Sequence, residues 1–273
     1  MVNGVSDRMG ASKMIFYNDN DPNSAKWLRE LSVRNLIAPG EVCSHSITDL
    51  DPYRLGAFTQ CHFFAGIGGW SYALRLAGWN DGNSVWTGSC PCQPFTTAGK
   101  GRGTSDERDL WPMWFRLIER VRPLTIFGEQ VPNAINHGWL DRTFDNLESI
   151  GYTTWAAILG ADFVGAPHIR KRLWFGATLG YTDSKRRKIK PVSDEKWQNL
   201  LEVARVGIGN PWRNFRTVEC RDGKIRQIPT EPELFPVVDG VPNRVALLRG
   251  YGNAIVPQVA ATFIKASRIA YGL

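Results

Sequence analysis

The chain has 273 residues, of which 43% are hydrophobic and 22% charged, an ordinary mix for a globular protein. No apolar run approaches the roughly 18 residues of a membrane helix, and the first residues lack the apolar core of a signal peptide. The five cysteines lack the spacing of a disulfide scaffold, so we expect free thiols in a reducing cytoplasm. The net charge is +7, and the surplus lies mainly in residues 181–226, where 12 Lys and Arg face 6 Asp and Glu. This excess indicates either a solvated surface or a face that contacts nucleic-acid phosphates.

The first 57 residues predict a strand, a helix and a second strand. Residues 14–17 (MIFY) are apolar enough for a short buried strand. Asp21 followed by Pro22 is a favoured helix start, because Asp accepts backbone N–H groups at the N-cap and Pro suits the first helical position. Residues 41–47 (EVCSHSI) predict another strand, and a polar connector follows.

Residues 58–95 combine a glycine turn with a cysteine loop. A strand runs into the turn FAGIGG, a helix and another strand follow, and the strand leads into Pro91 and Cys92. Such a turn brings backbone N–H groups close to a ligand, although its spacing is a poor match to the GxGxxG pattern of nicotinamide-binding proteins. Residues 96–109 are rich in glycine and charged side chains and predict a mobile loop.

Helices and strands continue to alternate up to residue 179. The pattern predicts helices at 110–121 and 139–149 and strands at 124–131, 152–159 and 172–179. This alternation indicates an α/β fold with a mostly parallel sheet. Residues 181–240 are basic and proline-punctuated with little periodicity, and a final helix begins near Pro257.

Three of these segments carry side chains suited to catalysis. Cys92 lies just past a strand end, where open α/β sheets bind ligands, and Glu129 ends the next strand at the same edge, where a partly desolvated carboxyl exchanges protons. Arg170 and Arg172 are two residues apart in an extended segment, so both face the same way. The plainer interpretations are an inert thiol, a surface glutamate and a basic surface strand. No CxxC or His-x-His pair accompanies the cysteines, so we predict no metal site.

Together these segments resemble the cytosine-carbon-5 DNA methyltransferases. The matching motifs are FFAGIGG, GSCPCQPFTTAG, FGEQV, GAPHIRKRLWF and YGNAIVPQVA, in the family's order and with a variable segment between the last two. The resemblance is to a short phage-borne or prophage-like form, and it covers most of residues 61–178 and 241–270. It implies a Rossmann-like S-adenosylmethionine-dependent fold with helices on both faces of the sheet and a small irregular target-recognition region.

The resemblance also implies a covalent mechanism on a cytosine that is flipped out of duplex DNA. Cys92 would add to ring carbon 6, Glu129 would hold the exocyclic amine and ring N3, and Arg172, with Arg170, would bind the ring oxygen and the backbone. Carbon 5 would then take the methyl of S-adenosylmethionine before a base removes its proton and the thiol leaves.

Three positions depart from the family pattern without removing a reacting group. Gln130 follows the glutamate where Asn is commoner, Thr96 stands where Ser is usual after the cysteine loop, and His168 precedes the arginine pair where Gln is usual. The last change could alter how the arginines are held.

The family's second and third strands have no room between the glycine turn and Cys92. Residues 14–50 have the right content, so we expect a circular rearrangement in which these two strands precede strand one; the alternative is an unrelated N-terminal cap. Asp19 would bind the ribose hydroxyls, and Ser46 and Ile47 would lie at the adenine. The full set expected around the cofactor is Asp19, Asn20, Ser46, Ile47, Phe64, Ala65, Gly66, Ile67, Gly68, Pro91, Asn253 and Ala254.

The expected organisation is a catalytic and cofactor-binding domain (1–180), a target-recognition region (181–240) and a segment that returns to the catalytic domain (241–273). Candidate DNA contacts are Gln93, Thr96, Arg102, Arg213, Arg216 and Arg221. We expect a monomer in a bacterial or phage-infected cytoplasm, associated with the nucleoid, with double-stranded DNA as partner and no membrane or metal. The alternatives are an RNA methyltransferase on the same scaffold, a catalytically inactive DNA-binding protein and a nicotinamide oxidoreductase, which would leave the cysteine loop and the arginine pair unexplained.

Overall fold

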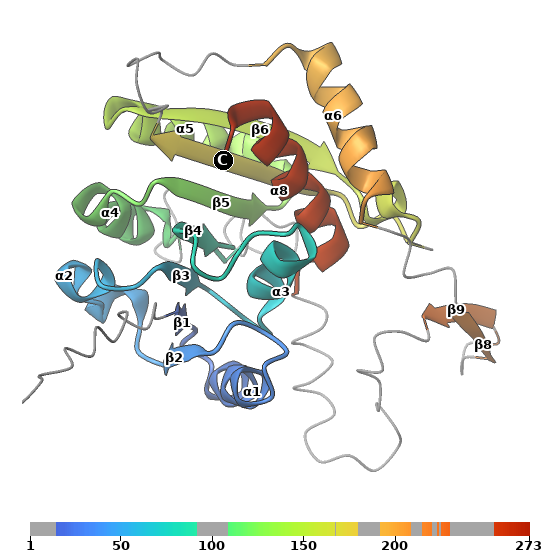
Figure 1. Cartoon of the computed structure of the whole chain (residues 1–273), viewed down its shortest axis with the longest axis horizontal. Helices are drawn as coiled ribbons and strands as arrows, with labels where there is room; N and C mark the ends of the chain where they lie inside the picture. The colour runs from blue at the N-terminus through green and yellow to red at the C-terminus, as the bar shows by residue number, and fades with distance from the viewer. Residues whose placement is uncertain are drawn as a thin grey trace, which may run out of the picture.

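The fold is built around one mixed sheet with helices on both faces (Figure 1). The computed structural model describes residues 15–91, 109–166, 168–179, 192–208, 215–219, 223, 225–229 and 254–273. The sheet has seven strands in the order β2-β1-β3-β4-β5-β7-β6. Neighbouring strands from β2 to β5 are parallel, and β7 runs antiparallel to both β5 and β6. The expected α/β architecture with a mostly parallel sheet is confirmed.

The elements follow one another along the chain with short connections. Their bounds are β1 (Ile15–Asn18), α1 (Pro22–Val33), β2 (Gly40–Cys43), α2 (Pro52–Leu55), β3 (Gln60–Phe63), α3 (Gly69–Leu76), β4 (Val85–Gly88), α4 (Trp111–Val121), β5 (Thr125–Gln130), α5 (Trp139–Ser149), β6 (Tyr152–Leu159), β7 (Arg172–Leu179), α6 (Asp194–Val206), β8 (Phe215–Glu219), β9 (Ile225–Pro229) and α8 (Pro257–Tyr271). Strands β8 and β9 form a separate antiparallel pair. Short 3₁₀ turns cover η1 (Ile47–Asp49), η4 (Pro132–His137) and η5 (Ala161–Val164).

The two strands that come first in the chain complete one side of the sheet. β1 pairs with β3, and β2 lies outside β1 at the sheet edge. These are the positions that the second and third strands occupy in a doubly wound sheet of order 3-2-1-4-5. The expected rearrangement of strand order is therefore confirmed. It is local: β3 occupies the place of strand one and leads directly to β4 and β5, which occupy the places of strands four and five.

The rearrangement gives one crossover the opposite hand to its neighbours. Helices α1, α3 and α8 pack on one face of the sheet, and α2, α4 and α5 pack on the other (Figure 1). The crossover β1-α1-β2 moves toward the β2 edge of the sheet with its helix on the first face. The crossovers β2-α2-β3 and β4-α4-β5 move in the opposite direction with their helices on the second face. Because both the direction and the face are reversed, these three crossovers have the same hand. The crossover β3-α3-β4 steps toward β5 on the first face. About 98% of such crossovers are right-handed, which identifies the hand shared by the other three as right-handed. The crossover β3-α3-β4 is therefore left-handed.

Several hydrogen bonds hold the turn that closes this left-handed crossover. The buried Gln60 amide donates to the carbonyls of Asn80, Asp81 and Asn83, at 3.2, 3.2 and 3.3 Å. Arg268 of α8 donates to the carbonyls at the end of α3, at 2.8 and 3.0 Å. The connection is thus fixed from the strand below it and from α8 beside it.

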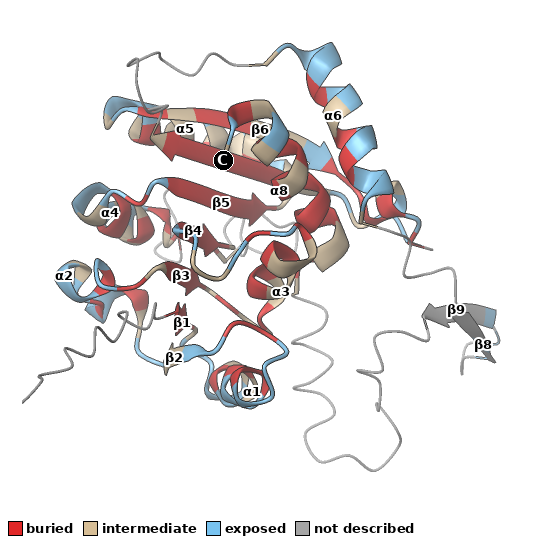
Figure 2. Ribbon diagram, in the orientation of Figure 1, coloured by how far each residue is buried: buried red, intermediate tan, exposed pale blue. Residues whose placement is uncertain are grey.

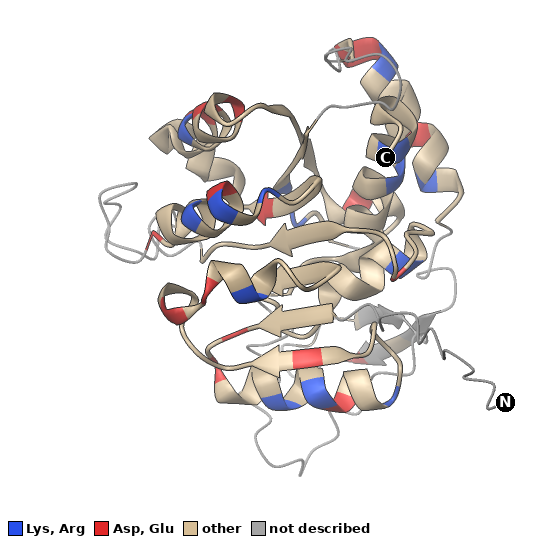
Figure 3. Cartoon of the chain, turned by 60° about the vertical axis from the view of Figure 1, so that its left-hand side comes forward, with Lys and Arg blue, Asp and Glu red and all other residues tan. Residues whose placement is uncertain are grey.

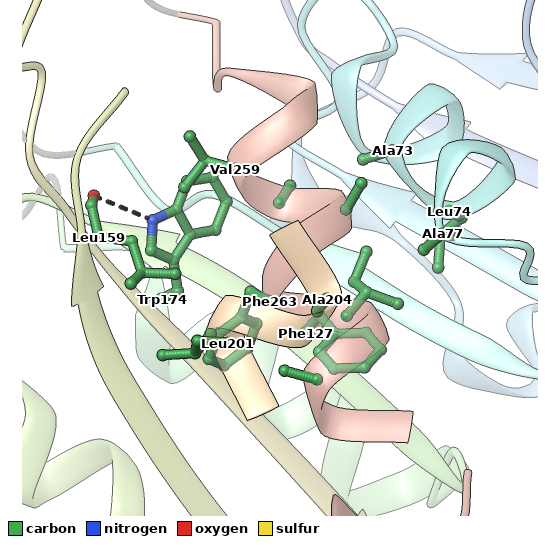
Figure 4. Packing of buried hydrophobic residues seen from close by; sticks show 14 of the residues in the cluster. Ala73, Leu74, Ala77, Phe127, Leu159, Trp174, Leu201, Ala204, Val259 and Phe263 are labelled. Atoms are coloured by element: carbon green, nitrogen blue, oxygen red, sulfur yellow. Dashed lines mark hydrogen bonds between the residues drawn. The ribbon is translucent and has the colours of Figure 1, made fainter. Parts of the chain in front are cut away.

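Two large apolar cores lie on opposite faces of the sheet. Figure 2 shows that the central strands between them are largely buried. On one face α8 lies between α3 and α6, and Phe127 of β5 packs edge-on against Phe263 of α8 (Figure 4). On the other face Trp111, Trp114, Trp139 and Phe175 form an aromatic cluster. Strands β4, β5, β6 and β7 each place side chains in both cores, as expected of strands that are covered on both faces.

Two paired glycines make room for the aromatic cluster. A Cβ built at Gly88 would lie 2.7 Å from the Trp114 ring, and one at Gly128 would lie 2.1 Å from the Phe175 ring. The two glycines are partners on β4 and β5. The rings therefore rest directly on the sheet backbone at this place.

Three details differ from the sequence expectations. β2 ends at Cys43 rather than at Ile47, because Ser46 caps the 3₁₀ turn η1. The connector that follows contains the short helix α2, for which Asp51 and Pro52 provide the start. α6 was not expected: its Trp197 and Leu201 are buried against α8, at the spacing of one helix face.

Charged side chains of both signs are mixed on the surface of α1, and α4 carries Arg116, Glu119 and Arg120 (Figure 3). Most of the basic excess of residues 181–226 lies outside the described residues. Among the helices that the structure describes, none is long and apolar enough to cross a membrane.

Candidate active site

The glycine turn and Asp19 lie together at the carboxyl ends of β3 and β1. Asp19 Oδ2 accepts the backbone N–H of Gly66 at 2.7 Å, and its Oδ1 accepts the N–H of Asp21 at 3.0 Å. Ala65 also donates its N–H to the carbonyl of Asn18 at 3.0 Å. Residues 47 positions apart in the chain thus form one corner. Burial raises the pKa of Asp19, and the two N–H donors lower it.

The backbone of the turn is shaped for close approach. Phe64 has a φ of 51°, a conformation that a non-glycine residue adopts at a cost, and Gly66 and Gly68 follow with φ of 53° and 81°. A Cβ built at Gly66 meets nothing within 4 Å, so the space beside this turn is open. Gly68 then caps α3 in the left-handed conformation. Backbone N–H groups at a helix start beside open space suit an anionic or polar ligand.

The neighbouring loop is held by a residue that the sequence analysis missed. Asn18 is buried at the end of β1, and its amide donates to the carbonyls of Cys43 and His45 at 3.3 and 2.9 Å. This positions the start of η1, where Ser46 is partly exposed and Ile47 is buried. Asn20 is exposed beyond Asp19. A polar residue inside an otherwise apolar strand was the signal for Asn18.

Glu129 and Arg172 form an ion pair at the carboxyl edge of β5. Arg172 Nε lies 2.8 Å from Glu129 Oε1, and the two side chains are 21% and 11% exposed. β7 starts at Arg172 beside the end of β5, so the two residues meet although they are far apart in the chain. Pro91 follows β4 at the same edge and is partly exposed.

Burial raises the pKa of the Glu129 carboxyl above its usual range. Arg172, a hydrogen bond with the Ser89 hydroxyl and the charge of Arg170 act in the opposite direction and lower that pKa. Ser89 also accepts the indole N–H of Trp70 at 3.0 Å. Ser89 was not among the residues predicted from the sequence, and its place between β4 and the cysteine loop was the available signal.

Arg170 and Arg172 differ in their partners, although both were expected to face the pocket. Arg170 donates to the carbonyl of Ala254 at 2.9 Å and so ties the segment before β7 to the start of α8. His168, two residues earlier, is largely exposed; partial desolvation and the positive charge of Arg170 lower its pKa. The structure thus brings Ala254 to the arginine segment, about 80 residues away in the chain.

Both ends of the segment that carries the cysteine loop are anchored in the core. At one end the Gln130 amide donates to the carbonyl of Cys90 at 3.3 Å. At the other end Asp109 is buried, pairs with Arg142 of α5 and accepts the N–H of Trp111 at 3.2 Å. Gln130, which departs from the family pattern, therefore anchors the backbone at Cys90, two residues before Cys92.

Several predicted residues lie outside the described part of the chain. They are Cys92, Gln93, Thr96, Arg102, Arg213, Arg221 and Asn253, and for Arg216 the structure describes only the backbone, in β8. The predicted mobile loop 96–109 also lies outside, apart from Asp109. Among the described residues, no cluster of three His, Cys, Asp or Glu side chains could hold a metal ion.

Two solved structures share this fold over nearly the whole chain. The Entamoeba histolytica methyltransferase EhMeth superposes with a TM-score of 0.51 at 13% identity, covering 94% of this chain and 98% of its own. A Spodoptera frugiperda DNMT2 mutant gives 0.51 at 15% identity, covering 93% and 99%. At these identities the likeness shows the fold alone.

Curated sequence relatives match a shorter part. Type II methyltransferase M.NgoMIV of Neisseria gonorrhoeae is 36% identical over 106 residues, which is 36% of this chain and 32% of the relative. M.AluI of Cellulosimicrobium cellulans is 32% identical over 119 residues, 39% of this chain and 22% of the relative. The match thus spans about a third or less of these relatives' length.

The family model for C-5 cytosine-specific DNA methylases matches residues 83–231, which is more than half of the chain. The matched range begins after the glycine turn, at the point where the chain returns to the usual strand order. With the fold and the paired Glu129 and Arg172 in place, the chain belongs to the family of C-5 cytosine-specific DNA methylases.

Proposed function

We propose that this protein transfers a methyl group from S-adenosylmethionine to carbon 5 of a flipped-out cytosine in duplex DNA. The observation that carries the proposal is the buried Glu129 paired with Arg172, at the sheet edge where β4 leads to Pro91 and Cys92. Cytosine presents an amine, a ring nitrogen and a carbonyl oxygen along one edge. A carboxyl and a guanidinium side by side are complementary to that edge.

The corner formed by Asp19 and the glycine turn fits the cofactor. Its carboxylate keeps free lone pairs beside its bonds to the Gly66 and Asp21 N–H groups and so has acceptors for ribose hydroxyls. The open side of Gly66 leaves room for the methionine part, and the buried Ile47 offers apolar contact to the adenine. When bound, the cofactor supplies the methyl group.

The protein's own groups do the rest of the chemistry. The Cys92 thiolate adds to carbon 6 of the ring while Glu129, whose pKa burial raises, protonates or hydrogen-bonds N3. Arg172 binds the ring oxygen and keeps the carboxyl in place. The electron pair then resides at carbon 5, which becomes the nucleophile. After transfer, a base takes the carbon-5 proton, the carbon–sulfur bond breaks with its electron pair returning to the Cys92 thiolate, and N3 returns any proton that it received to Glu129, which restores the aromatic ring.

We narrow the proposed recognition region within residues 181–240. α6 belongs to the core, because Trp197, Leu201 and Ala204 pack into the cluster around α8. We assign target recognition to the stretch beyond α6, which includes the β8–β9 pair. This stretch contains Arg213, Arg216 and Arg221. The protein acts in the cytoplasm as a monomer, in a restriction-modification setting.

The test uses DNA that contains 5-fluorocytosine, labelled S-adenosylmethionine and total RNA in a parallel arm. We expect a covalent protein–DNA adduct that is lost in Cys92→Ser, and methylated cytosines at one short sequence when plasmid from an expressing strain is bisulfite-sequenced. Label in RNA alone would favour the RNA methyltransferase alternative. DNA binding without label or adduct would favour an inactive binding protein and overturn the proposal.

A further inference from the structure

A chain of polar side chains links helix α3 to strand β7 through the candidate site. The indole N–H of Trp70, the second residue of α3, donates to Ser89 Oγ at 3.0 Å. Ser89 and Glu129 directly follow the paired glycines Gly88 and Gly128, so they are neighbours across the ends of β4 and β5, and the Ser89 hydroxyl acts on the Glu129 carboxyl as a hydrogen-bond partner. Glu129 Oε1 lies 2.8 Å from Arg172 Nε. The four side chains come from α3, the end of β4, β5 and β7. Helix α3 directly follows the glycine turn, so the chain connects the candidate cofactor corner to the carboxyl.

The direction of each hydrogen bond follows from the groups involved. An indole nitrogen only donates, so the Ser89 oxygen must accept from Trp70. The single hydroxyl proton of Ser89 then remains to be donated. An ionised carboxylate can only accept hydrogen bonds, and Glu129 is the carboxylate that accepts this bond from Ser89. Glu129 therefore receives one hydrogen bond from Ser89 and one from Arg172.

We propose that Ser89 is a positioning residue: its hydroxyl, oriented by the Trp70 indole, donates to Glu129 and holds this carboxyl for the base. The inference rests on the proposed function for the role of Glu129, and it adds a residue that the mechanism above does not use. Donors from two sides fix the plane of the carboxyl. Its remaining lone pairs are the ones left for the cytosine edge.

The donor side of this chain is rigid. Trp70 is 3% exposed, and its ring packs edge-on against Trp174 at 5.6 Å between centroids. The indole therefore cannot turn without disturbing the core. Ser89 is only partly buried, so the hydrogen bond rather than packing determines its hydroxyl direction.

A second indole–serine pair in the same protein supplies the matched control. Trp155 donates to Ser267 Oγ at 2.9 Å, and the Ser267 hydroxyl donates to the Phe263 carbonyl at 2.8 Å. The donors and acceptors are of the same kind, but this second series of hydrogen bonds ends at a backbone carbonyl within α8. Ser267→Ala thus removes the same group without touching a carboxyl.

Among the residues that the structure describes, three ionisable groups interact with Glu129. Arg172 pairs with it from β7, Arg170 acts from the segment before β7, and the buried Cys90 thiol follows β4. Arg172, the Ser89 hydrogen bond and Arg170 all favour the ionised carboxylate. Loss of the Ser89 hydroxyl removes a donor that stabilises the charged form, so the pKa of Glu129 rises further.

The experiment follows Glu129 directly by carbon-13 NMR of the full chain with labelled glutamate carboxyls, its signal assigned by its disappearance in Glu129→Gln. We expect an upward shift of the Glu129 titration in Ser89→Ala, a smaller one in Trp70→Phe and a wild-type curve in Ser89→Thr. Ser267→Ala should lower the unfolding midpoint and leave the titration unchanged. In methyl transfer, Ser89→Ala should lower kcat about tenfold with an unchanged KM for the cofactor.

A wild-type Glu129 titration in folded Ser89→Ala would overturn the inference, and so would a shift of equal size in Ser267→Ala. Trp70→Phe leaves Ser89 in place, so it supplies an independent readout if Ser89→Ala fails to fold. The titration needs no substrate. A wild-type protein that transfers no methyl group would refute the proposed function, while the NMR curves would still decide the role of Ser89.

Discussion

The carboxylate of Asp19 carries the prediction that depends most on the rearranged strand order. Its Oδ2 accepts the Gly66 N–H at 2.7 Å, which leaves lone pairs for the ribose hydroxyls. A hydrogen bond to a charged group contributes about 1.5–3 kcal/mol. Asp19→Ala should therefore weaken cofactor binding by roughly 10- to 150-fold. Asp19→Asn keeps an acceptor for Gly66 but loses the charge, so we expect an intermediate loss.

Isothermal titration with S-adenosylhomocysteine at pH 8, where the carboxylate is ionised, measures these affinities without turnover. Asp21 provides the control, because it lies two residues away and caps α1 by accepting the Asn23 N–H at 3.0 Å. Asp21→Ala should cost about 1 kcal/mol of stability and leave the affinity unchanged. An Asp19→Ala affinity within twofold of wild type, or an equal loss in Asp21→Ala, would refute the ribose assignment.

Three further predictions concern stability. The pKa of Glu129 is raised in the folded state, so the free energy of unfolding should fall as the pH rises from the unfolded-state pKa of about 4.5 through the folded-state pKa. Glu129→Gln should remove this pH dependence. Urea titrations at several pH values measure it, and the same pH dependence in Glu129→Gln and in the wild type would contradict the prediction. Gly128→Ala should cost about 1–3 kcal/mol, because its Cβ would overlap the Phe175 ring. Phe175→Leu in the same chain should recover part of that loss in a double-mutant cycle. Leu201→Ala, in the fully buried face of α6, should cost about 2–5 kcal/mol, whereas Val203→Ala, 62% exposed, should leave the unfolding midpoint nearly unchanged.

The sheet was predictable from the sequence because its strands are short apolar runs and residues such as Gly, Pro, Asn and Asp mark the turns between them. The strand at 152–159 and the helix at 139–149 match β6 and α5 residue for residue. The placement of β1 and β2 followed from the content of residues 14–50 rather than from their order. The position of strands in the sheet, rather than their order along the chain, determines which residues form the binding site. The carboxyl ends of parallel strands lie at one edge whatever that order.

Tertiary contacts supplied what local patterns could not. α6 lies in a charged stretch of weak periodicity, and burial against α8 reveals its apolar face. The hydrogen bond between Trp70 and Ser89 depends on the crossing of α3 over β4, which no spacing rule describes. The separate partners of Arg170 and Arg172 likewise follow from where α8 begins.

The left-handed crossover has a consequence for the order of folding. Gln60 pairs with Val85, 25 positions later in the chain, so closing the connection through α3 costs little entropy compared with more distant contacts. A left-handed unit is nevertheless unstable by itself, since a right-twisted strand that feeds a right-handed helix returns to the sheet with the other hand. Arg268 of α8 bonds the turn that completes this unit, from a position 191 residues later than Ala77. During synthesis the glycine turn and the strand that leads to the nucleophile therefore leave the ribosome early, but the hydrogen bonds from Arg268 that help to hold this unit form only after α8 has followed.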